Sequence, residues 1–221
     1  MSRNGWLSHT PPSFRRAVLD RCVLQKVESD ATIYASGDPP GGMYGLVSGA
    51  LKVSVAQGER GPYFAHFFGP GDWFGEGPAI SGRARIVGLS AARESEVLHL
   101  SLRSVDEILG KEPASWRLFS ALTLGKLEAA MWAIDDLMMR DSRKRFVAVL
   151  LRLGGCRAAT PPGAVPIAVH VSQDDLAAMA NLSRSTANAI LRKLEAAGYV
   201  TQSYRQIGIV SPDRLRSMLV E

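Results

Sequence analysis

The chain has 221 residues, 46% of them hydrophobic and 21% charged, and a formal net charge of +5. This mixture excludes a disordered chain, and no apolar run approaches the eighteen or so residues that a membrane-spanning helix needs. Residues 1–14 contain two prolines and no apolar stretch, so they are not a secretory signal, and we expect a cytoplasmic protein with no membrane partner.

The first half of the chain predicts a β-rich sensor domain over residues 15–113, preceded by a tail at 1–14. Helical spacing of apolar residues predicts a helix at 15–28. Short strands separated by glycine-rich turns then predict an antiparallel β-roll of the jelly-roll kind, within an α+β fold. The expected strands are Thr32–Tyr34, Gly42–Val47, Leu51–Val55, Tyr63–Phe68, Ile86–Ala92 and Glu96–Ser101.

A long helix is predicted next, from about Ala114 to Met139, after a short helix at Leu102–Leu109. Its apolar residues are spaced three and four apart, which is typical of a heptad seam. They are Leu124, Leu127, Met131, Ile134 and Met138. Because a second apolar set lies off this seam, we expect 114–140 to be a dimerisation helix in a homodimer.

The positive charge is concentrated in the last domain, which we place at 141–221. From Ser142 onward there are 11 Lys/Arg and 5 Asp/Glu, against 15 and 16 before it. A basic half joined to a neutral half is typical of a phosphate-binding module attached to another domain, although a basic segment can also bind a membrane surface.

Two capped helices joined by a short turn follow a helix at Ser142–Leu153 and a strand at Ile167–Val171. Ser172 begins the first with Asp175 in the place of a capping-box acid, and Gln173 follows the cap. Asn181 suits a left-handed turn, and Ser183 caps a second helix at Arg184–Ala197. Two strands around Ser203-Tyr204-Arg205 complete a winged helix-turn-helix.

The second helix has one apolar and one polar side. Ala187, Ile190, Leu191 and Leu194 form a stripe that predicts burial. The other side carries hydrogen-bonding groups suited to double-stranded DNA. With the first helix, the predicted DNA-binding residues are Ser172, Gln173, Ser183, Arg184, Ser185, Thr186, Asn188, Arg192 and Lys193.

This order of parts resembles the Crp–Fnr family of bacterial transcription regulators. The resemblance covers about residues 15–210 and is most specific in Tyr44–Gly49, Gly69–Glu76, Leu182–Thr186 and Ile190–Glu195. It implies a dimer whose sensor binds a small effector and reorients the DNA-binding domains, with RNA polymerase as a candidate partner.

The resemblance also points to effector-binding residues. In members that bind cyclic AMP, a Gly-Glu pair and an Arg-Ser/Thr pair hold the ribose and phosphate. Gly75 and Glu76 match the first pair; Arg85, or alternatively Arg83, matches the arginine. The hydroxyl neighbour is replaced by Ile86 or Ala84.

The adenine-contacting Thr and Ser of those members correspond to Ala130 and Met131 here. A cyclic phosphate and an adenine both need polar partners, so we expect weak or absent cyclic AMP binding and an effector of unknown identity. A Glu76–Arg85 ion pair that only stiffens the roll is the alternative.

The predicted reading helix departs from the best-known members, because Ser185 and Ala189 replace their base-reading Glu and Arg. We therefore expect a different operator, read through Arg184, Ser185, Asn188 and DNA shape. Two alternatives to an effector-controlled regulator stay open: a sensor module that acts through protein contacts, and a regulator that needs no effector.

The remaining residues predict neither catalysis nor a bound cofactor. Cys22 and Cys156 are far apart without a CxxC motif, so we expect reduced thiols. The four histidines show no metal-ligand spacing, which argues against a metal-dependent enzyme on a similar roll.

Overall fold

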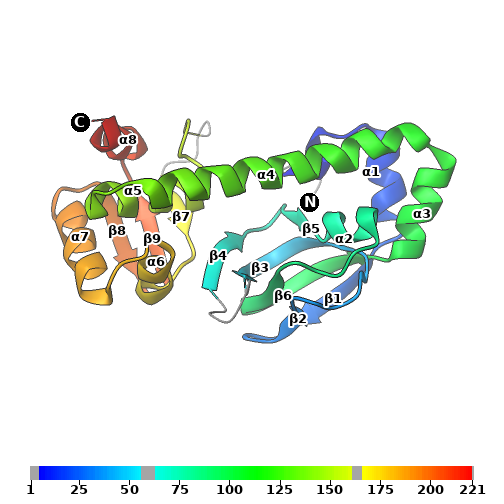
Figure 1. Ribbon diagram of the computed structural model, residues 1–221, viewed down its shortest axis with the longest axis horizontal. Helices are drawn as coiled ribbons and strands as arrows, with labels where there is room; N and C mark the ends of the chain where they lie inside the picture. The colour runs from blue at the N-terminus through cyan, green and yellow to red at the C-terminus, as the bar shows by residue number, and fades with distance from the viewer. Residues whose placement is uncertain (1–4, 56–62, 161–165, 221) are drawn as a thin grey trace. The chain divides into compact units, whose positions relative to one another are not determined.

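The structure is a computed structural model that describes residues 5–55, 63–160 and 166–220. The chain forms two compact units, an N-terminal unit (Met1–Glu128) and a C-terminal unit (Ala129–Glu221). Their boundary lies within the long helix α4, Trp116–Met138 (Figure 1). We describe each unit separately.

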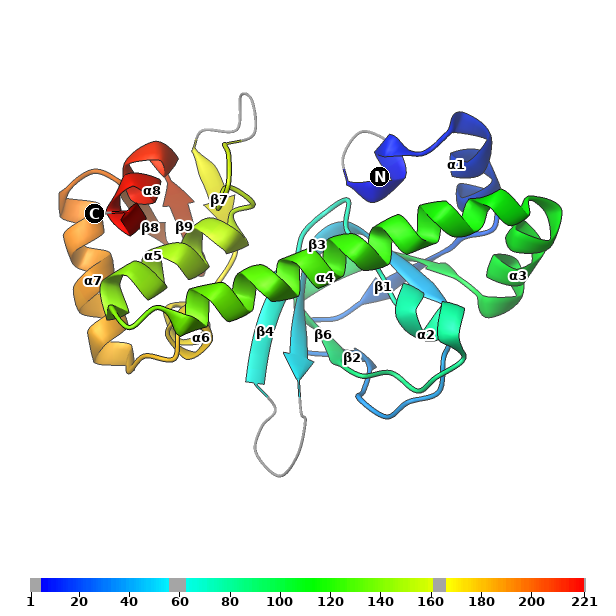
Figure 2. The same cartoon turned by 45° about the horizontal axis from the view of Figure 1, so that its top comes forward.

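An antiparallel sheet with the strand order β1-β6-β3-β4 forms the β-roll of the N-terminal unit (Figure 2). In addition, β2 pairs with β6, and β5 pairs with β3. Its strands are β1 (Val23–Val27), β2 (Thr32–Tyr34), β3 (Met43–Val55), β4 (Tyr63–Phe68), β5 (Trp73–Phe74) and β6 (Gly88–Leu100). The strands β3 and β6 are longer than predicted. Their pairing shifts register between Leu46 and Leu51 of β3, and both strands continue through these irregularities instead of ending there.

Two apolar clusters lie on opposite sides of this sheet. Inside the roll are Tyr34, Leu46, Leu51, Val53, Phe68, Phe74, Leu89, Ala91 and Val97. The other cluster joins the sheet to η1 (Trp6–His9), α1 (Pro12–Leu19), α3 (Leu102–Lys111) and the start of α4. The short η2 (Pro113–Ser115) connects α3 to α4. Alternation along β3 separates them, since Met43 belongs to the second cluster and Leu46 to the first.

Two expectations for the N-terminus are wrong. Part of the proposed tail is built into the core, since Leu7 and Phe14 are buried and the Trp6 indole Nε1 donates to the carbonyl of Leu118 at 2.8 Å. The helix predicted at 15–28 ends at Leu19, and Val23–Val27 instead pairs with β6. A non-local strand pairing overrides the local helical spacing here.

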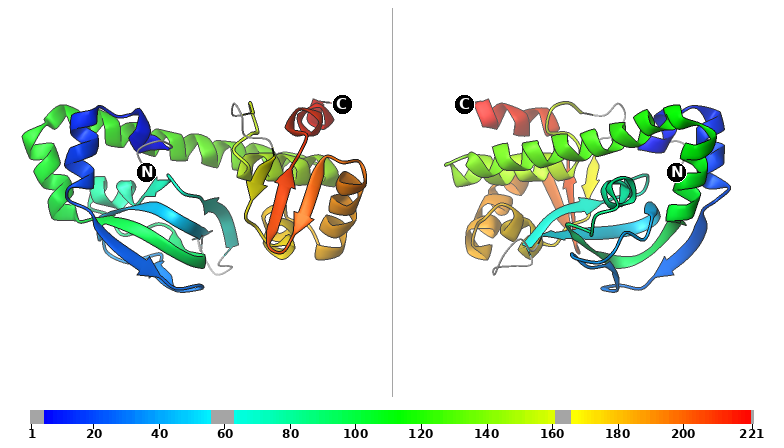
Figure 3. Two further views of the ribbon diagram at one scale, coloured as in Figure 1. Left: turned by 180° about the vertical axis from the view of Figure 1, so that it is seen from behind. Right: turned by 45° about the vertical axis from the view of Figure 1, so that its right-hand side comes forward.

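A three-stranded sheet and several helices form the C-terminal unit (Figure 3). The strand order is β7-β9-β8, from β7 (Ile167–Val169), β8 (Val200–Ser203) and β9 (Gln206–Ile209). The helices are α5 (Ser142–Leu153), α6 (Gln173–Met179), α7 (Arg184–Ala196) and α8 (Pro212–Val220), the last of which was not predicted. Asp141 caps α5, accepting from the amides of Arg143 and Lys144 at 2.8 and 2.9 Å.

A buried carboxylate explains why the C-terminal unit begins within α4 rather than at residue 141. Asp136 is 0% exposed, and its two oxygens accept from Arg152 Nε at 2.8 Å and Arg157 Nε at 2.9 Å. The Arg157 guanidinium also lies 5.2 Å from the Trp132 ring centre. We call Asp136, Arg152 and Arg157 the Asp136 cluster; it attaches the last turns of α4 to α5 and the segment after it.

Candidate functional site

The helix-turn-helix is set by three local features that the sequence predicted. Ser172 Oγ accepts from the amide of Asp175 at 3.0 Å and donates to its carboxylate at 2.7 Å. Ser183 Oγ accepts from the amide of Thr186 at 3.2 Å. Asn181 between them has φ 51°, the left-handed conformation that ends α6 and starts the turn. Both caps and the turn are therefore confirmed.

The two sides of α7 differ as its pattern predicted. Ala187, Ile190, Leu191 and Leu194 are buried. Exposed side chains include Arg184, Ser185, Ala189, Arg192 and Lys193. Asn188 departs from the prediction because it lies beside the buried stripe: it is half-buried, and its Oδ1 is enclosed without a hydrogen-bond partner among the described residues.

The exposed start of α7 is engaged with α6 and with its own cap. Arg184 Nε lies 3.0 Å from Asp174 Oδ1, and both side chains remain largely exposed. The hydroxyls of Ser185 and Thr186 lie 3.0 and 2.8 Å from Ser183 Oγ. Asp174 was not singled out from the sequence, because only the folded turn brings it to a residue ten positions later.

The β8–β9 hairpin, which we call the wing, is tied to both helices through Gln202. Its amide nitrogen donates to Glu195 Oε1 at 3.1 Å, and its Nε2 donates to Glu195 Oε2 at 2.6 Å. Gln173, at the start of α6, donates to Gln202 Oε1 at 2.7 Å. Gln202 and Glu195 were missed in the sequence because their contacts cross between elements.

In the N-terminal unit, Arg85 and Arg83 have different environments. Arg83 is exposed, whereas Arg85 is 3% exposed and its Nη2 donates to the carbonyl of Gly42 at 3.1 Å. The guanidinium carbon of Arg85 lies 3.8 Å from the Tyr34 ring centre. The other nitrogen, Nη1, is buried without a hydrogen-bond partner among the described residues. Arg85 therefore retains a buried positive group able to bind an anion.

Gly75 and Glu76 lie next to this arginine. Gly75 has φ 89°, and a Cβ there would lie 2.8 Å from the Gly42 carbonyl oxygen and 3.0 Å from Arg85 Nη1, so only glycine fits. Glu76 is buried at the start of α2 (Glu76–Ser81). No ion pair joins Glu76 to Arg85 in the part of the chain that the structure describes, so the alternative of a stiffening pair is wrong.

Glu76 is instead influenced by a lysine from α4. Burial raises the pKa of Glu76, while a hydrogen bond from its own backbone and the charge of Lys126 lower it in part. Burial lowers the pKa of Lys126, opposed by Asp72 and Glu76, and its Nζ lies 4.0 Å from the Phe68 ring centre. Nothing in the sequence singles out Lys126, which stands between two residues of the apolar seam.

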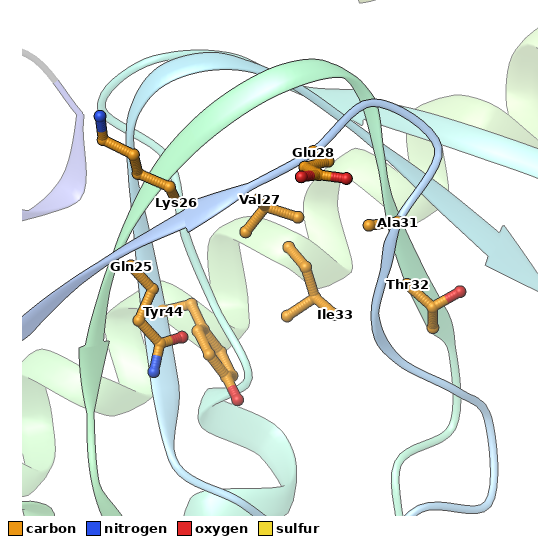
Figure 4. A pocket seen from close by; sticks show the side chains of 8 residues that line it. All are labelled: Gln25, Lys26, Val27, Glu28, Ala31, Thr32, Ile33 and Tyr44. Atoms are coloured by element: carbon orange, nitrogen blue, oxygen red, sulfur yellow. The ribbon is translucent and has the colours of Figure 1, made fainter.

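Several aromatic rings pack together inside the roll near Arg85. The Tyr44 ring stacks on Phe74 at 5.7 Å and on His99 at 4.6 Å, and its centre lies 5.7 Å from the Arg85 guanidinium carbon. Tyr44 also lines a pocket of about 440 Å³, with β1, β2 and the segment between them (Figure 4). The other lining residues are Gln25, Lys26, Val27, Glu28, Ala31, Thr32 and Ile33. Its volume is within the range of small-molecule sites.

The predicted seam of α4 is exposed in the isolated chain. Leu124, Leu127, Met131 and Ile134 are each 56% exposed, and Met138 is 76% exposed. Such a row of large apolar side chains is unusual on a free surface. Met131, which was also predicted to bind effector, belongs to the C-terminal unit.

The remaining features of the described residues concern thiols, metal sites and membrane spans. Cys22 and Cys156 are free thiols, as expected, and burial raises the pKa of Cys22 to about 12. Within residues 5–55, 63–160 and 166–220, no three His, Cys, Asp or Glu side chains are grouped to hold a metal ion. No described helix is long and apolar enough to cross a membrane.

Comparison with known proteins agrees with both units. A model of the cyclic nucleotide-binding domain matches residues 24–112, and a model of the Crp-like helix-turn-helix domain matches residues 144–218. The cAMP-activated global transcriptional regulator CRP of Pasteurella multocida is 25% identical over 80% of this chain and 85% of its own length. A CRP-like cAMP-activated global transcriptional regulator of Mycobacterium tuberculosis is 21% identical over 97% and 96%.

Solved structures show the same fold. FixK2 from Bradyrhizobium japonicum has a TM-score of 0.74 at 22% identity and covers 89% of this chain and 96% of its own. The c-di-GMP-responsive regulator CLP of Xanthomonas campestris has a TM-score of 0.67 at 19% identity, covering 90% and 99%. Members of this family are transcription regulators rather than enzymes. With two matched domains in the same order, this chain belongs to the Crp–Fnr family and is a transcription regulator with a helix-turn-helix DNA-binding domain.

Proposed function

We propose that this regulator works as a homodimer controlled by an anionic small effector that binds at Arg85 and is not cyclic AMP. The observation that carries the proposal is the guanidinium of Arg85, which is buried yet has no hydrogen-bond partner for Nη1 among the residues that the structure describes. A buried cation without a counter-charge is costly, and an anion at Nη1 would relieve that cost.

The surroundings of Arg85 favour a ligand with a planar part. The rings of Tyr34 and Tyr44 lie 3.8 and 5.7 Å from the guanidinium carbon of Arg85, measured to the ring centres. Ile86 follows Arg85 where cyclic AMP binders have a hydroxyl, and Ala130 and Met131 offer no polar edge to an adenine. Although several relatives are named as cAMP-activated, these substitutions support a different effector here.

A ligand screen with two arginine variants tests the effector proposal. Thermal shifts would be measured against a panel of phosphate- and carboxylate-bearing metabolites for wild type, Arg85→Gln and Arg83→Gln. We expect ligands that raise the Tm of wild type and Arg83→Gln but not of Arg85→Gln. Calorimetry should show no micromolar binding of cyclic AMP. Micromolar binding of cyclic AMP, or ligands that shift Arg85→Gln as strongly as wild type, would refute it.

For DNA, we propose that the start of α7 reads the major groove with Arg184 as its main contact. Its side chain is exposed, and Asp174 at 3.0 Å holds it without burying it. The supporting residues are Ser172, Gln173, Ser183, Ser185, Thr186, Arg192 and Lys193, with a smaller part for Asn188 because it is half-buried.

Arg184→Ala should weaken specific DNA binding by about 1–3 kcal/mol, measured by fluorescence anisotropy. An unchanged sequence preference would show that another face binds DNA.

The exposed seam of α4 supports the homodimer. A second copy would cover Leu124, Leu127, Met131, Ile134 and Met138, the row that a heptad pattern places on one side. Analytical ultracentrifugation of Leu127→Glu should show a monomer at concentrations where wild type is dimeric. Glu128→Gln, an exposed change one residue away, is the control and should remain dimeric. A dimeric Leu127→Glu chain would place the interface elsewhere.

A further inference from the structure

The turn of the wing presents two side chains that the functions above do not use. Tyr204 is 90% exposed, more than any other large apolar or aromatic side chain of the described residues. Arg205 beside it is exposed, and its guanidinium carbon lies 5.8 Å from the Tyr204 ring centre. Neither side chain contributes to a core cluster, so packing does not explain why they stand at this turn.

The backbone at Arg205 is held in an unfavourable conformation. Its φ is 52°, in the left-handed region where glycine or asparagine is usual. Among the described residues, the other two non-glycine positions with positive φ are Asp30 and Asn181, whose short polar side chains tolerate it. A long, charged residue kept at such a position indicates a role for the side chain itself.

The wing is fixed relative to the DNA-reading helix. Gln202, two residues before Tyr204, binds Glu195 of α7 at 2.6 Å and Gln173 of α6 at 2.7 Å. Gln173 is followed by Asp174, which pairs with Arg184. Because these hydrogen bonds join the wing to the start of α6 and to the last turn of α7, the turn moves together with α7 when α7 enters a groove.

The charge of the wing suits nucleic acid. From Tyr199 to Val210 the sequence contains no acidic residue, and Arg205 is its one charged residue. No ion pair to Arg205 occurs in the described part of the chain. A hairpin beside a helix in the major groove meets the next groove of the duplex, and an arginine is attracted by the narrow minor groove of A·T-rich DNA.

We infer that Arg205, supported by Tyr204, enters the minor groove beside the half-site read by α7 and makes the regulator prefer A·T-rich flanks. This rests on the proposed docking of α7 in the major groove. It assigns a specificity-determining role to the wing, at base pairs that α7 does not reach. The minor groove distinguishes A·T from G·C through the guanine N2 amino group, which would obstruct the arginine.

The test uses the full-length chain and a duplex that it selects from a random-sequence pool. Three versions would carry A·T, G·C or inosine·cytosine pairs next to the half-site. Inosine lacks the N2 amino group, so its pair with cytosine resembles A·T in the minor groove and G·C in the major groove. We expect wild type to bind the A·T and inosine·cytosine flanks alike and the G·C flank about fivefold or more weakly.

Two wing variants and one control complete the experiment. Arg205→Ala should bind all three flanks with equal affinity, and so should Arg205→Gly, which suits the positive φ and should unfold at or above the wild-type Tm. Arg214→Ala, which removes an exposed arginine from α8, should keep the flank preference.

The outcomes separate this inference from the proposed function. A wild type indifferent to the flanks, or an Arg205→Ala chain that keeps the preference, would overturn the role of the wing while the docking of α7 stands. A loss of affinity in Arg205→Ala that is equal for all flanks would also overturn it, because it would indicate a phosphate contact. Failure of the wild type to select any duplex would overturn the docking of α7, and this inference with it.

Discussion

Two buried charged groups, one in each unit, differ in whether their polar atoms have hydrogen-bond partners within the chain. Asp136 in the C-terminal unit is fully enclosed, and each of its oxygens accepts from an arginine. Arg85 in the N-terminal unit is almost as enclosed, but it donates to one carbonyl, lies near two aromatic rings and has no described partner for Nη1. The nearby carboxylate of Glu76 makes no ion pair with it in the described structure.

The difference separates a structural role from a binding role. A charge whose partners are complete within the chain has no capacity left for a ligand, and removing it disrupts the fold. A buried charged group that lacks one of its partners lowers the stability of the fold. A ligand that supplies the missing partner can restore that stability, as expected for a sensor. The Asp136 cluster should therefore matter most for folding, and Arg85 for the response to effector.

The largest effect is expected from Asp136→Ala. This change leaves Arg152, whose side chain is 7% exposed, as a buried cation without its carboxylate. The free energy of unfolding of the C-terminal unit should fall by about 3–5 kcal/mol, measured by urea denaturation and circular dichroism. Asp135→Ala is the matched control, because Asp135 is 60% exposed and pairs with Arg157 at 3.3 Å. It should cost no more than about 1 kcal/mol. If both variants lost the same unfolding free energy, the buried Asp136 cluster would have no special role in stability.

Arg85→Met should have a smaller effect on stability. Methionine keeps much of the volume and removes an incompletely paired charge, at the loss of one hydrogen bond and two cation–π contacts. Unfolding free energy should fall by no more than about 1–2 kcal/mol. Arg83→Met, at an exposed position, should change it less. A loss as large as that of Asp136→Ala would mean that Arg85 is structural after all.

Features that depend on neighbours in sequence were predictable. The caps at Ser172 and Ser183, the left-handed Asn181 and the buried stripe of α7 follow from rules that act over a few residues. Charge counting located the DNA-binding half for a similar reason, since it needs no knowledge of contacts. The helices α3 to α7 and most strands followed from their turns and periodicities.

Features that depend on distant partners were not predictable. In the sequence, Asp136 is one of two consecutive aspartates on an apolar helix, and nothing nearby indicates that it is buried between two arginines. Lys126 stands between Leu124 and Leu127 of the α4 seam in the sequence, but it approaches Phe68 and Glu76 in the roll. The helix expected to continue past Leu19 gives way to β1 because β6, about seventy residues later, pairs with it. Such contacts exist only once the chain is folded.

Removing the hydroxyl of Ser183, an exposed residue that caps α7, should have an intermediate effect on stability. Ser183→Ala removes the acceptor for the Thr186 amide and should lower the stability of the C-terminal unit by about 1 kcal/mol, measured by urea denaturation. Ser185→Ala removes a hydroxyl that caps nothing and should change stability by less than half as much. If both variants lose the same stability, the Ser183 cap does not hold the start of α7.

The smallest effect, and the most direct probe of the incomplete pairing in the roll, is the pH dependence of Glu76. Its pKa is raised above the ordinary 4.5, so the folded chain holds the proton to a higher pH than the unfolded chain does. That contribution to stability is complete below about pH 4.5 and is lost as the pH rises through the raised pKa. Glu76→Gln should therefore gain Tm relative to wild type between pH 4.5 and 8. Glu94→Gln, at an exposed position, should show no such trend. If the wild type instead gained Tm relative to Glu76→Gln as the pH rises, the carboxylate would be stabilised by partners in the roll, and the contrast with the Asp136 cluster would fail.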